Sequence, residues 1–327
     1  MRNIGKISET VLERSVLKPI KQNKVGIKKG AGIGLDCALF SDKGISTGYI
    51  AFKDSRACEH AIVSACNNLW AEGIKPAVVT LSVSLPDTFR EIKLKEIMKQ
   101  ACETASTLGI KIAGGHTEYV QGLVNPVISV TAVGDNADGL YATGDYQTDN
   151  KELDIVMTKW MAISGTSIIA RDKKEELVTK LPAYYIEDAA QLGQFTDISS
   201  EAASAVKPAG TVAMHDVAAG GIFTALWELC EKMGLGCKVD LNRIPVRQET
   251  IEVCEFYDIN PYRLRGDGSL LIATTNGDKL VEELIGKGIL ATIIGHTTEC
   301  IDRTVIRDEE IRFLEPANGD EIVKVMC

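Results

Sequence analysis

A glycine turn after a short apolar run offers the clearest anion-binding chemistry in this sequence. The run at 212–214 ends at His215 and Asp216, and the chain then passes through Gly220 and Gly221 into a helix-patterned segment. Paired glycines at a helix N-terminus let ligand oxygens approach the free backbone N–H groups, where the helix dipole favours negative charge. We therefore expect a phosphate at this turn. Alternatively, the glycines only let the helix pack closely on its strand.

A second glycine-rich stretch, GAGIGLDCALF, precedes a predicted strand and contains a carboxylate. Gly32 and Gly34 alternate with other residues before Asp36. A dinucleotide-binding fingerprint needs a strand before its glycines and a helix after them, so this spacing does not predict one. A flexible backbone followed at once by a carboxylate would instead let Asp36 reach a hydrated Mg²⁺ on a bound phosphate. Otherwise, Asp36 only ends a turn.

Two further polar groups lie where predicted elements end. Asn68 stands near the end of a predicted helix, and the stretch GGHTE places Gly114, Gly115 and His116 after a predicted strand at 110–113. This is again a glycine pair with polar side chains at the end of a strand. The four histidines of the chain have no zinc-ligand spacing, so we predict no structural zinc.

The composition indicates a globular protein and limits its partners. Of the 327 residues, 45% are hydrophobic and 25% are charged, and the formal net charge of -9 argues against a nucleic-acid backbone as the main partner. No apolar run approaches the roughly 20 residues that span a bilayer, and the N-terminus lacks the apolar segment of a signal peptide. Nine cysteines without a C-x-x-C pair suit a reducing compartment. We therefore expect a cytoplasmic protein with no membrane or nucleic-acid partner.

Periodicity predicts strands, glycine turns and helices that recur in both halves of the chain. Helices are predicted at 7–17, 57–71, 89–108, after Gly165 and Thr166, in three stretches within 173–206, and at 222–233, 247–257 and 278–286. Strands are predicted at 37–40, 49–52, 77–85, 110–113, 126–133, 155–158, 212–214, 236–239, 269–274 and 291–294, with a hairpin at 305–314. In the helix at 222–233, Glu228, Glu231 and Lys232 are predicted on the solvent side. The polar stretch at 135–153 divides the chain into predicted domains 1–145 and 146–327.

Five motifs occur in an order that is typical of one protein family. They are GAGIGLDCALF, NNLWAEGIKP, GGHTE, MHDVAAGGIFTAL and RGDGSLL. Together they make the chain resemble the aminoimidazole ribonucleotide (AIR) synthase-related, or PurM-like, superfamily over residues 3–315. Within it, the chain looks most similar to the hydrogenase-maturation branch of the expression/formation protein HypE. Thiamine-monophosphate kinase and selenophosphate synthetase are relatives of that branch.

The resemblance implies a two-domain architecture of mixed α+β and α/β class. Its N-terminal domain would bind ATP and pair its sheet with that of a second subunit, and its C-terminal domain would be α/β. ATP would lie in a cleft, with its phosphates held through Mg²⁺ by carboxylates at strand ends. Carried over motif by motif, Asp36 and Asp54 become the metal ligands. The implied nucleotide contacts are Gly32, Gly34, Asp36, Asp54, Asn68, Gly114, Gly115, His116, Asp216, Gly220 and Gly221.

Two departures from the family's motifs concern its metal site. The family's N-D pair is Asn67-Asn68 here, and its G-G-D-T pattern has His116 in place of the aspartate. Mg²⁺ prefers charged oxygen ligands, so the loss of two carboxylates predicts weaker metal binding, for which Glu118 compensates only if the strand end bends. In a phosphate site, His116 would make nucleotide affinity rise as the pH falls. Otherwise, His116 is a polar strand-end residue bonded to a backbone carbonyl.

Cys327, the last residue, has a counterpart in the hydrogenase-maturation branch. There, the resemblance implies, ATP is used on a carbamoyl group carried by a C-terminal cysteine, which becomes a thiocyanate. Cys327 and His116 are accordingly the candidate catalytic residues, although the family's proline-arginine-isoleucine-cysteine ending is missing and we expect Cys327 on a mobile tail. This interpretation predicts a carbamoyl or small-molecule acceptor, a homodimer and a maturation partner protein. The alternatives are a small-molecule kinase of the thiamine-monophosphate-kinase type and a catalytically silent nucleotide-binding protein.

Overall fold

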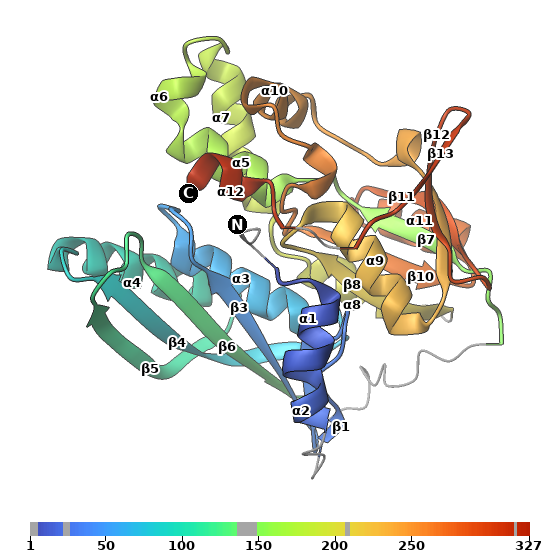
Figure 1. The fold of residues 1–327 in the computed structure, drawn as a ribbon, viewed down its shortest axis with the longest axis horizontal. Coiled ribbons are helices and arrows are strands. Elements are labelled where there is room, and N and C mark those ends of the chain that lie inside the picture. The colour runs from blue at the N-terminus through green and yellow to red at the C-terminus, as the bar shows by residue number, and fades with distance from the viewer. Residues whose placement is uncertain (1–5, 22–26, 136–148, 207–209, 317–318) are drawn as a thin grey trace.

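A computed structural model describes residues 6–21, 27–135, 149–206, 210–316 and 319–327, and it contains two β-sheets with helices packed on them (Figure 1). The first sheet has six strands in the order β1-β2-β3-β6-β4-β5. Its strands are β1 (Ile27–Lys29), β2 (Cys37–Phe40), β3 (Lys43–Ile50), β4 (Lys75–Pro86), β5 (Lys111–Val120) and β6 (Val127–Asp135). Neighbours are antiparallel except β4 and β5, which are parallel.

Helices α3 (Ala57–Trp70) and α4 (Glu91–Thr107) lie on one face of this sheet (Figure 1). The apolar side chains of α3, such as Ile62 and Leu69, are fully buried. Gly48 on β3 permits this close packing, because a Cβ there would lie 2.1 Å from the carbonyl oxygen of Ala61. Burial alternates along β3, so that Tyr49 and its face neighbours are exposed on the other side. Among the described residues, the second face of this sheet therefore remains open.

The second sheet has seven strands in the order β13-β12-β9-β11-β7-β10-β8. They are β7 (Asp154–Thr158), β8 (Thr211–Val217), β9 (Gly236–Asp240), β10 (Ser269–Thr274), β11 (Ala291–Thr298), β12 (Arg303–Arg307) and β13 (Glu310–Phe313). Each residue of β10 is buried, because the strand lies inside the sheet with helices on both faces. Leu271 packs in one apolar cluster with α9, and its neighbour Ile272 packs in another with α8 and α11.

The helices of the second half complete a layered α/β arrangement around this sheet. They are α5 (Ile163–Asp172), α6 (Lys174–Leu177), α7 (Ala183–Gln191), α8 (Ser199–Val206), α9 (Gly221–Met233), α10 (Gln248–Tyr257), α11 (Gly277–Gly286) and α12 (Ile322–Met326). Single 3₁₀ turns are η2 (Leu192–Phe195), η3 (Leu241–Arg243) and η4 (Pro261–Arg263). The predicted mixed architecture of helices and sheets is confirmed, and the strands of the second sheet are antiparallel to their neighbours except for β9 and β12, which are parallel. The predicted boundary between residues 145 and 146 lies outside the described residues, so that division stays a prediction.

The N-terminal helical segment packs on the second half of the molecule. It consists of α1 (Glu9–Leu12), a π-helical turn η1 (Glu13–Leu17) and α2 (Lys18–Lys21), and it therefore continues past the predicted end at residue 17. The indole of Trp227 on α9 donates a hydrogen bond to the carboxylate of Glu9. The N-terminal segment thus brings the residues just before α1 close to α9.

Two predictions of local structure are wrong. The strand predicted at 110–113 continues as β5 to Val120, so the glycine pair lies inside a strand rather than at its end. Gly115 permits the pairing with β4, because a Cβ there would lie 1.9 Å from the carbonyl oxygen of Leu81. The end of the chain is also not a mobile tail but the helix α12, which buries Val325 and Met326.

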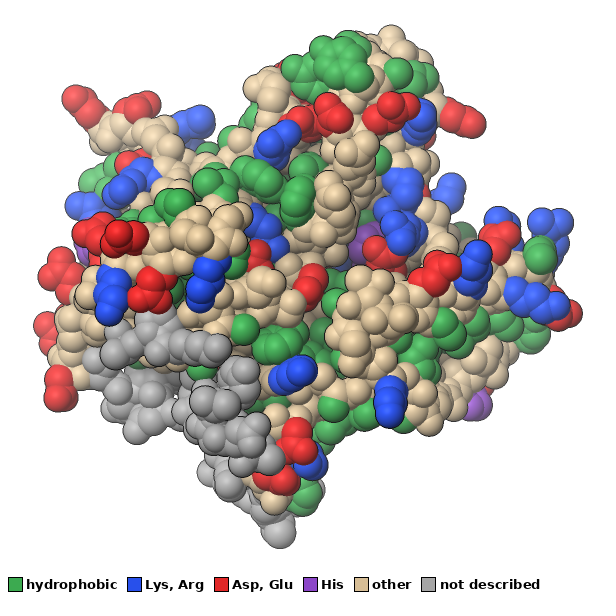
Figure 2. Space-filling view, turned by 180° about the vertical axis from the view of Figure 1, so that it is seen from behind, with side chains coloured by type: hydrophobic (Ala, Val, Ile, Leu, Met, Phe, Trp, Pro, Cys, Tyr) green, Lys and Arg blue, Asp and Glu red, His purple; other side chains and the backbone are tan. Residues whose placement is uncertain are grey.

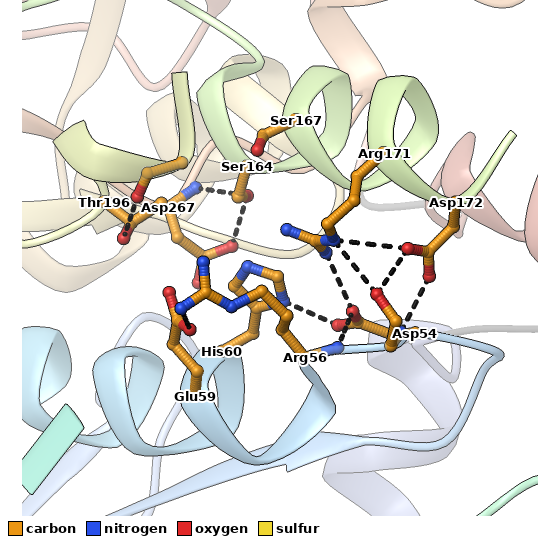
Figure 3. A network of polar contacts seen from close by, with 12 residues as sticks. Asp54, Arg56, Glu59, His60, Ser164, Ser167, Arg171, Asp172, Thr196 and Asp267 are labelled. Atoms are coloured by element: carbon orange, nitrogen blue, oxygen red, sulfur yellow. Dashed lines mark hydrogen bonds and ion pairs between the residues drawn. The ribbon is translucent and has the colours of Figure 1, made fainter. Parts of the chain in front are cut away.

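The two halves of the molecule meet through a polar network (Figure 3). Arg171 on α5 donates from Nη2 to Oδ1 of Asp54 at 3.1 Å, and the Nδ1 atom of His60 lies 2.6 Å from Oδ2 of Asp54. The backbone N–H of Ser55 donates to Oδ2 of Asp172 at 2.7 Å. These bonds tie the loop before α3 to the end of α5 and fix how the halves face each other.

The surface carries charges of both signs. Acidic and basic side chains are interspersed on the face drawn in Figure 2, rather than collected into a patch of one sign. In the described part of the chain, no helix combines the length and the apolar character that a membrane crossing needs.

Candidate functional site

A pocket of about 480 Å³ lies between the two halves of the molecule. Its walls come from β3, α3, the turn between β8 and α9, and α12. Five of the predicted site residues line it, although they are far apart in the sequence: Asp36, Asn68, Asp216, Gly220 and Cys327. A cavity of this size suits a small-molecule ligand.

Asp36, His215 and Asp216 form the acidic centre of this pocket. One ligand atom from each lies within 4.8 Å of the others, and this is the only such group among the described residues. Asp216 is 3% exposed, and its Oδ2 atom finds no hydrogen-bond partner within the described chain. Burial raises the pKa of Asp216 to about 7, opposed by His215 and reinforced by Asp36. A buried carboxylate oxygen without a donor needs a proton or a cation.

A chain of charged groups extends from this centre to the N-terminal segment. Nε2 of His215 lies 3.2 Å from Oε2 of Glu228, and Nζ of Lys6 lies 2.7 Å from the other oxygen of Glu228. On its other side, Nδ1 of His215 is 3.8 Å from Oδ2 of Asp36. Burial would lower the pKa of His215, but the bond to Glu228 and the charge of Asp36 raise it. Burial would raise the pKa of Glu228, but Lys6 and His215 hold it at about 2.

The turn at the start of α9 already holds an anion from the chain itself. Gly220 and Gly221 have φ angles of 85° and 67°, in the left-handed region that favours glycine. The N–H of Gly220 donates to Oδ2 of Asp320 at 2.9 Å, so it is not free for a phosphate. A Cβ at Gly221 would lie 2.6 Å from the carbonyl oxygen of Tyr262, so this glycine also serves close packing, as the alternative interpretation proposed.

Cys327 reaches the pocket at the end of α12. The side chains of Ile322 and Met326 are buried against the core, whereas Cys327 is exposed and lines the pocket. Partial burial raises the pKa of the Cys327 thiol. The short helix therefore presents a thiol to the same cavity as the acidic centre.

The remaining motif residues near the pocket make contacts that support its walls. The amide of Asn68 donates from Nδ2 to the carbonyl of Thr47 at 3.2 Å. A Cβ at Gly34 would lie 2.2 Å from the carbonyl oxygen of Glu228, so this glycine lets the loop before Asp36 approach α9. Gly32 forms an isolated bridge within the same loop.

Asp54 is not brought to the acidic centre. Its side chain is fully buried and its two oxygens contact Arg171 and His60 in the network between the halves. Burial would raise the pKa of Asp54, but these two partners hold it at about 2. A carboxylate that is saturated by a guanidinium and an imidazole has little capacity left for a metal ion.

Gly114, Gly115 and His116 lie apart from the pocket, on β5 at the edge of the first sheet. The His116 side chain is 68% exposed, and its Nε2 atom lies 3.4 Å from Oε2 of Glu118. The two side chains thus reach each other along one face of the strand. Within the described chain, neither lines the pocket that contains Asp36 and Asp216.

Sequence reasoning missed four charged residues of the pocket. Glu228 was predicted on the solvent side of α9, and Lys6, Arg265 and Asp320 were not singled out, yet all four line the cavity. The partners of Lys6 and Asp320 lie 222 and 100 residues away along the chain. A spacing rule cannot find such pairs, although the RGDGSLL motif did contain Arg265.

Sequence comparisons match both halves to one family. The AIR synthase related protein N-terminal domain matches residues 36–135, and the C-terminal domain of the same family matches residues 154–306. A putative hydrogenase expression/formation protein from Methanocaldococcus jannaschii is 23% identical, covering 98% of this chain and 97% of the relative. The carbamoyl dehydratase HypE of Rhizobium leguminosarum is also 23% identical, over 72% of this chain and 66% of the relative.

Solved structures share the fold. A HypE–HypF complex contains a chain that matches with a TM-score of 0.71 and 18% identity, covering 92% of this chain and 99% of the other. The hydrogenase maturation protein HypE in complex with ATP matches with a TM-score of 0.67 and 16% identity, covering 98% of both chains. At these identities the likeness establishes the architecture alone.

Proposed function

Because the chain belongs to the AIR synthase related family, we propose that it is an ATP-dependent enzyme of the hydrogenase-maturation type. It uses ATP to dehydrate a carbamoyl group carried on Cys327. The observation that carries this proposal is that Cys327 lines the same pocket as Asp36 and Asp216. The relatives named carbamoyl dehydratase and the HypE complex with ATP support the choice of reaction and of nucleotide.

Mg²⁺ and the nucleotide phosphates would be held at the acidic centre. The donor set fits a cation, because the buried Oδ2 of Asp216 has no partner among the described residues and Asp36 lies next to it. Carboxylates suit Mg²⁺ and imidazoles do not, so Asp36 and Asp216 would hold the ion while His215 stays bonded to Glu228. A bound Mg²⁺ neutralises charge on the transferred phosphoryl group. The ammonium of Lys6 adds a second positive charge at the same wall of the pocket.

The proposed reaction begins with a carbamoyl group bonded to the sulfur of Cys327. The carbamoyl oxygen attacks the γ-phosphorus of ATP, and the bond to ADP breaks. The carbon–oxygen bond then breaks, phosphate leaves with that oxygen, and the nitrogen loses its two protons to leave a thiocyanate. His215, which is held by Glu228, is a group of the pocket that can accept a proton. The pocket walls position the thiol and the phosphates, which is the main contribution a protein makes to phosphoryl transfer.

Two assembly partners belong to this proposal. A second protein must supply the carbamoyl group, and the relative solved as a HypE–HypF complex supports a maturation partner. A second copy of this chain would cover the open face of the first sheet, where Tyr49 and Ile45 are exposed. A half-buried sheet with apolar residues on its free face is satisfied by a symmetric partner.

Replacing the thiol tests the proposal. Cys327→Ser should bind ATP as the native chain does but should accept no carbamoyl mass from a carbamoyl-donating maturation protein, while Cys300→Ser, at another exposed cysteine, should behave as the native chain. ATP consumption that is unchanged in Cys327→Ser would instead favour a small-molecule kinase. ATP binding without turnover in the native chain, under conditions in which a HypE relative reacts, would favour a catalytically silent protein.

A further inference from the structure

Asp320 makes an unusual set of contacts just before α12. Its Oδ2 accepts the N–H of Gly220 at 2.9 Å, and its Oδ1 accepts the N–H of Arg265 at 3.2 Å and that of Ile322 at 3.0 Å. One carboxylate therefore joins the turn before α9, the loop before β10 and the first turn of α12. These are the three segments that form one end of the pocket.

The environment of Asp320 supplies several hydrogen-bond donors to its carboxylate. Gly220 stands at the N-terminus of α9, a 13-residue helix whose dipole and free N–H groups favour an anion. The guanidinium of the buried Arg265 lies nearby and lowers the pKa of Asp320, although burial raises it overall. At the helix end that motif spacing assigned to a phosphate, the N–H of Gly220 is thus satisfied by a side chain of the C-terminal segment.

The helix that Asp320 begins is held in place only by its contacts with the rest of the molecule. It is five residues long, too short to be stable by itself. Its other anchors are the buried side chains of Ile322, Val325 and Met326 and a hydrogen bond from the N–H of Lys53 to the carbonyl of Met326 at 3.4 Å. At its start, the N–H of Glu321 donates to the carbonyl of Arg263 at 3.3 Å, and Oε2 of Glu321 accepts the N–H of Asn260 at 3.3 Å. The direction of α12, and hence the place of its last residue, depends on where its first turn is fixed.

We propose that Asp320 is a positioning residue, which fills the anion-accepting turn before α9 and thereby directs the thiol of Cys327 into the pocket with Asp36 and Asp216. While α12 is docked, the N–H of Gly220 belongs to Asp320, and the phosphates of a nucleotide bind on the Lys6 side of the pocket. The proposal deepens the proposed function and rests on it for its importance. The effect of Asp320 on the Cys327 thiol can be measured without any turnover.

The rate at which iodoacetamide alkylates each cysteine, followed by peptide mass spectrometry, tests this positioning. Cys102 and Cys300 are exposed and do not line the pocket, so they serve as internal standards, and the buried Cys66 reports unfolding. Burial raises the pKa of the Cys327 thiol, so release of α12 should increase both its thiolate fraction and its access to the reagent. We expect Asp320→Ala to speed the alkylation of Cys327 severalfold, with unchanged rates at Cys102 and Cys300.

Two further variants keep the test decisive. Asp320→Asn preserves the shape but not the charge, and it should speed alkylation of Cys327 in the same direction by a smaller factor. Glu315→Gln removes a carboxylate from the same segment, one that pairs with Arg263 at 2.7 Å and not with Gly220, and it should have no effect. If Cys66 becomes reactive in Asp320→Ala, the outcome with Asp320→Asn decides. Unchanged alkylation of Cys327 in folded Asp320 variants would overturn the proposal, whether or not the protein dehydrates a carbamoyl group.

Discussion

Asp216 is the residue whose charge state most directly sets the chemistry of the pocket. It is buried beside Asp36 and His215, and its pKa is raised to about 7. Its carboxylate is therefore only partly ionised near neutral pH, and a cation must displace the remaining proton. The neighbouring His215, whose pKa is also raised, carries a charge at low pH that repels a cation in the same way.

This charge state predicts a pH dependence of Mg²⁺-dependent ATP binding. Affinity should rise by roughly tenfold from about pH 6 to about pH 8, because one proton is displaced from Asp216 over this range. Calorimetric titration of ATP with and without Mg²⁺ measures it, and Asp216→Asn should remove both the metal dependence and the pH dependence. This direction is opposite to that predicted for His116 in a phosphate site. A metal-dependent affinity that does not change over this range would exclude Asp216 as the cation ligand.

At the scale of elements, the loop before α3 and helix α5 are joined by a carboxylate that the family resemblance had assigned to metal binding. Asp54 contacts Arg171 on α5 at 3.1 Å and His60 on α3 at 2.6 Å. Removing one partner of a buried ion pair leaves the others unpaired and is strongly destabilising. The structure therefore gives Asp54 a task in holding the halves together.

Asp54→Asn should lower the free energy of unfolding by about 3 kcal/mol without changing the Mg²⁺ dependence of ATP binding. The pKa of Asp54 is lowered from 3.8 to about 2, so its contribution to stability is present above about pH 4 and is lost as the pH falls through about 2. Urea unfolding at neutral pH measures the effect, with the exposed Asp42→Asn as control. A normally stable Asp54→Asn protein that has lost metal-dependent binding would restore Asp54 as a metal ligand.

Periodicity predicted most helices and strands. It failed where contacts with distant parts of the backbone determine whether a strand continues or a short helix forms. The glycine pair at 114–115 indicated the end of a strand, yet pairing with β4 continues through it because the missing Cβ of Gly115 admits the Leu81 carbonyl. Helix α12 is too short to produce a periodic signal, and burial of Met326 stabilises it only in the folded molecule. Asp36 and Asp216 were found from motifs, whereas Asp320 and Lys6 depend on contacts across the whole chain.

At the scale of the whole molecule, a dimer differs from a monomer in whether a second copy covers the open face of the first sheet. Thr131 lies at the middle of this face, in register with Thr47 on β3 and Thr80 on β4. Thr131→Lys should convert a dimer to a monomer, because a buried unpaired ammonium is costly in an interface. Light scattering at micromolar concentration measures the mass, and Ser106→Lys on α4 is the control on the helical side. A native protein with the mass of one chain would refute the dimer.

The proposed function depends on Cys327 carrying the group on which ATP is used. The most direct measurement is the mass of the Cys327 peptide, taken first after carbamoylation by a maturation partner and again after addition of ATP and Mg²⁺. We predict a gain of one carbamoyl group at Cys327, followed by the loss of the mass of one water only when ATP is present. A carbamoyl group that is installed on Cys327 and keeps its mass with ATP, while a HypE relative completes the reaction under the same conditions, would contradict the account.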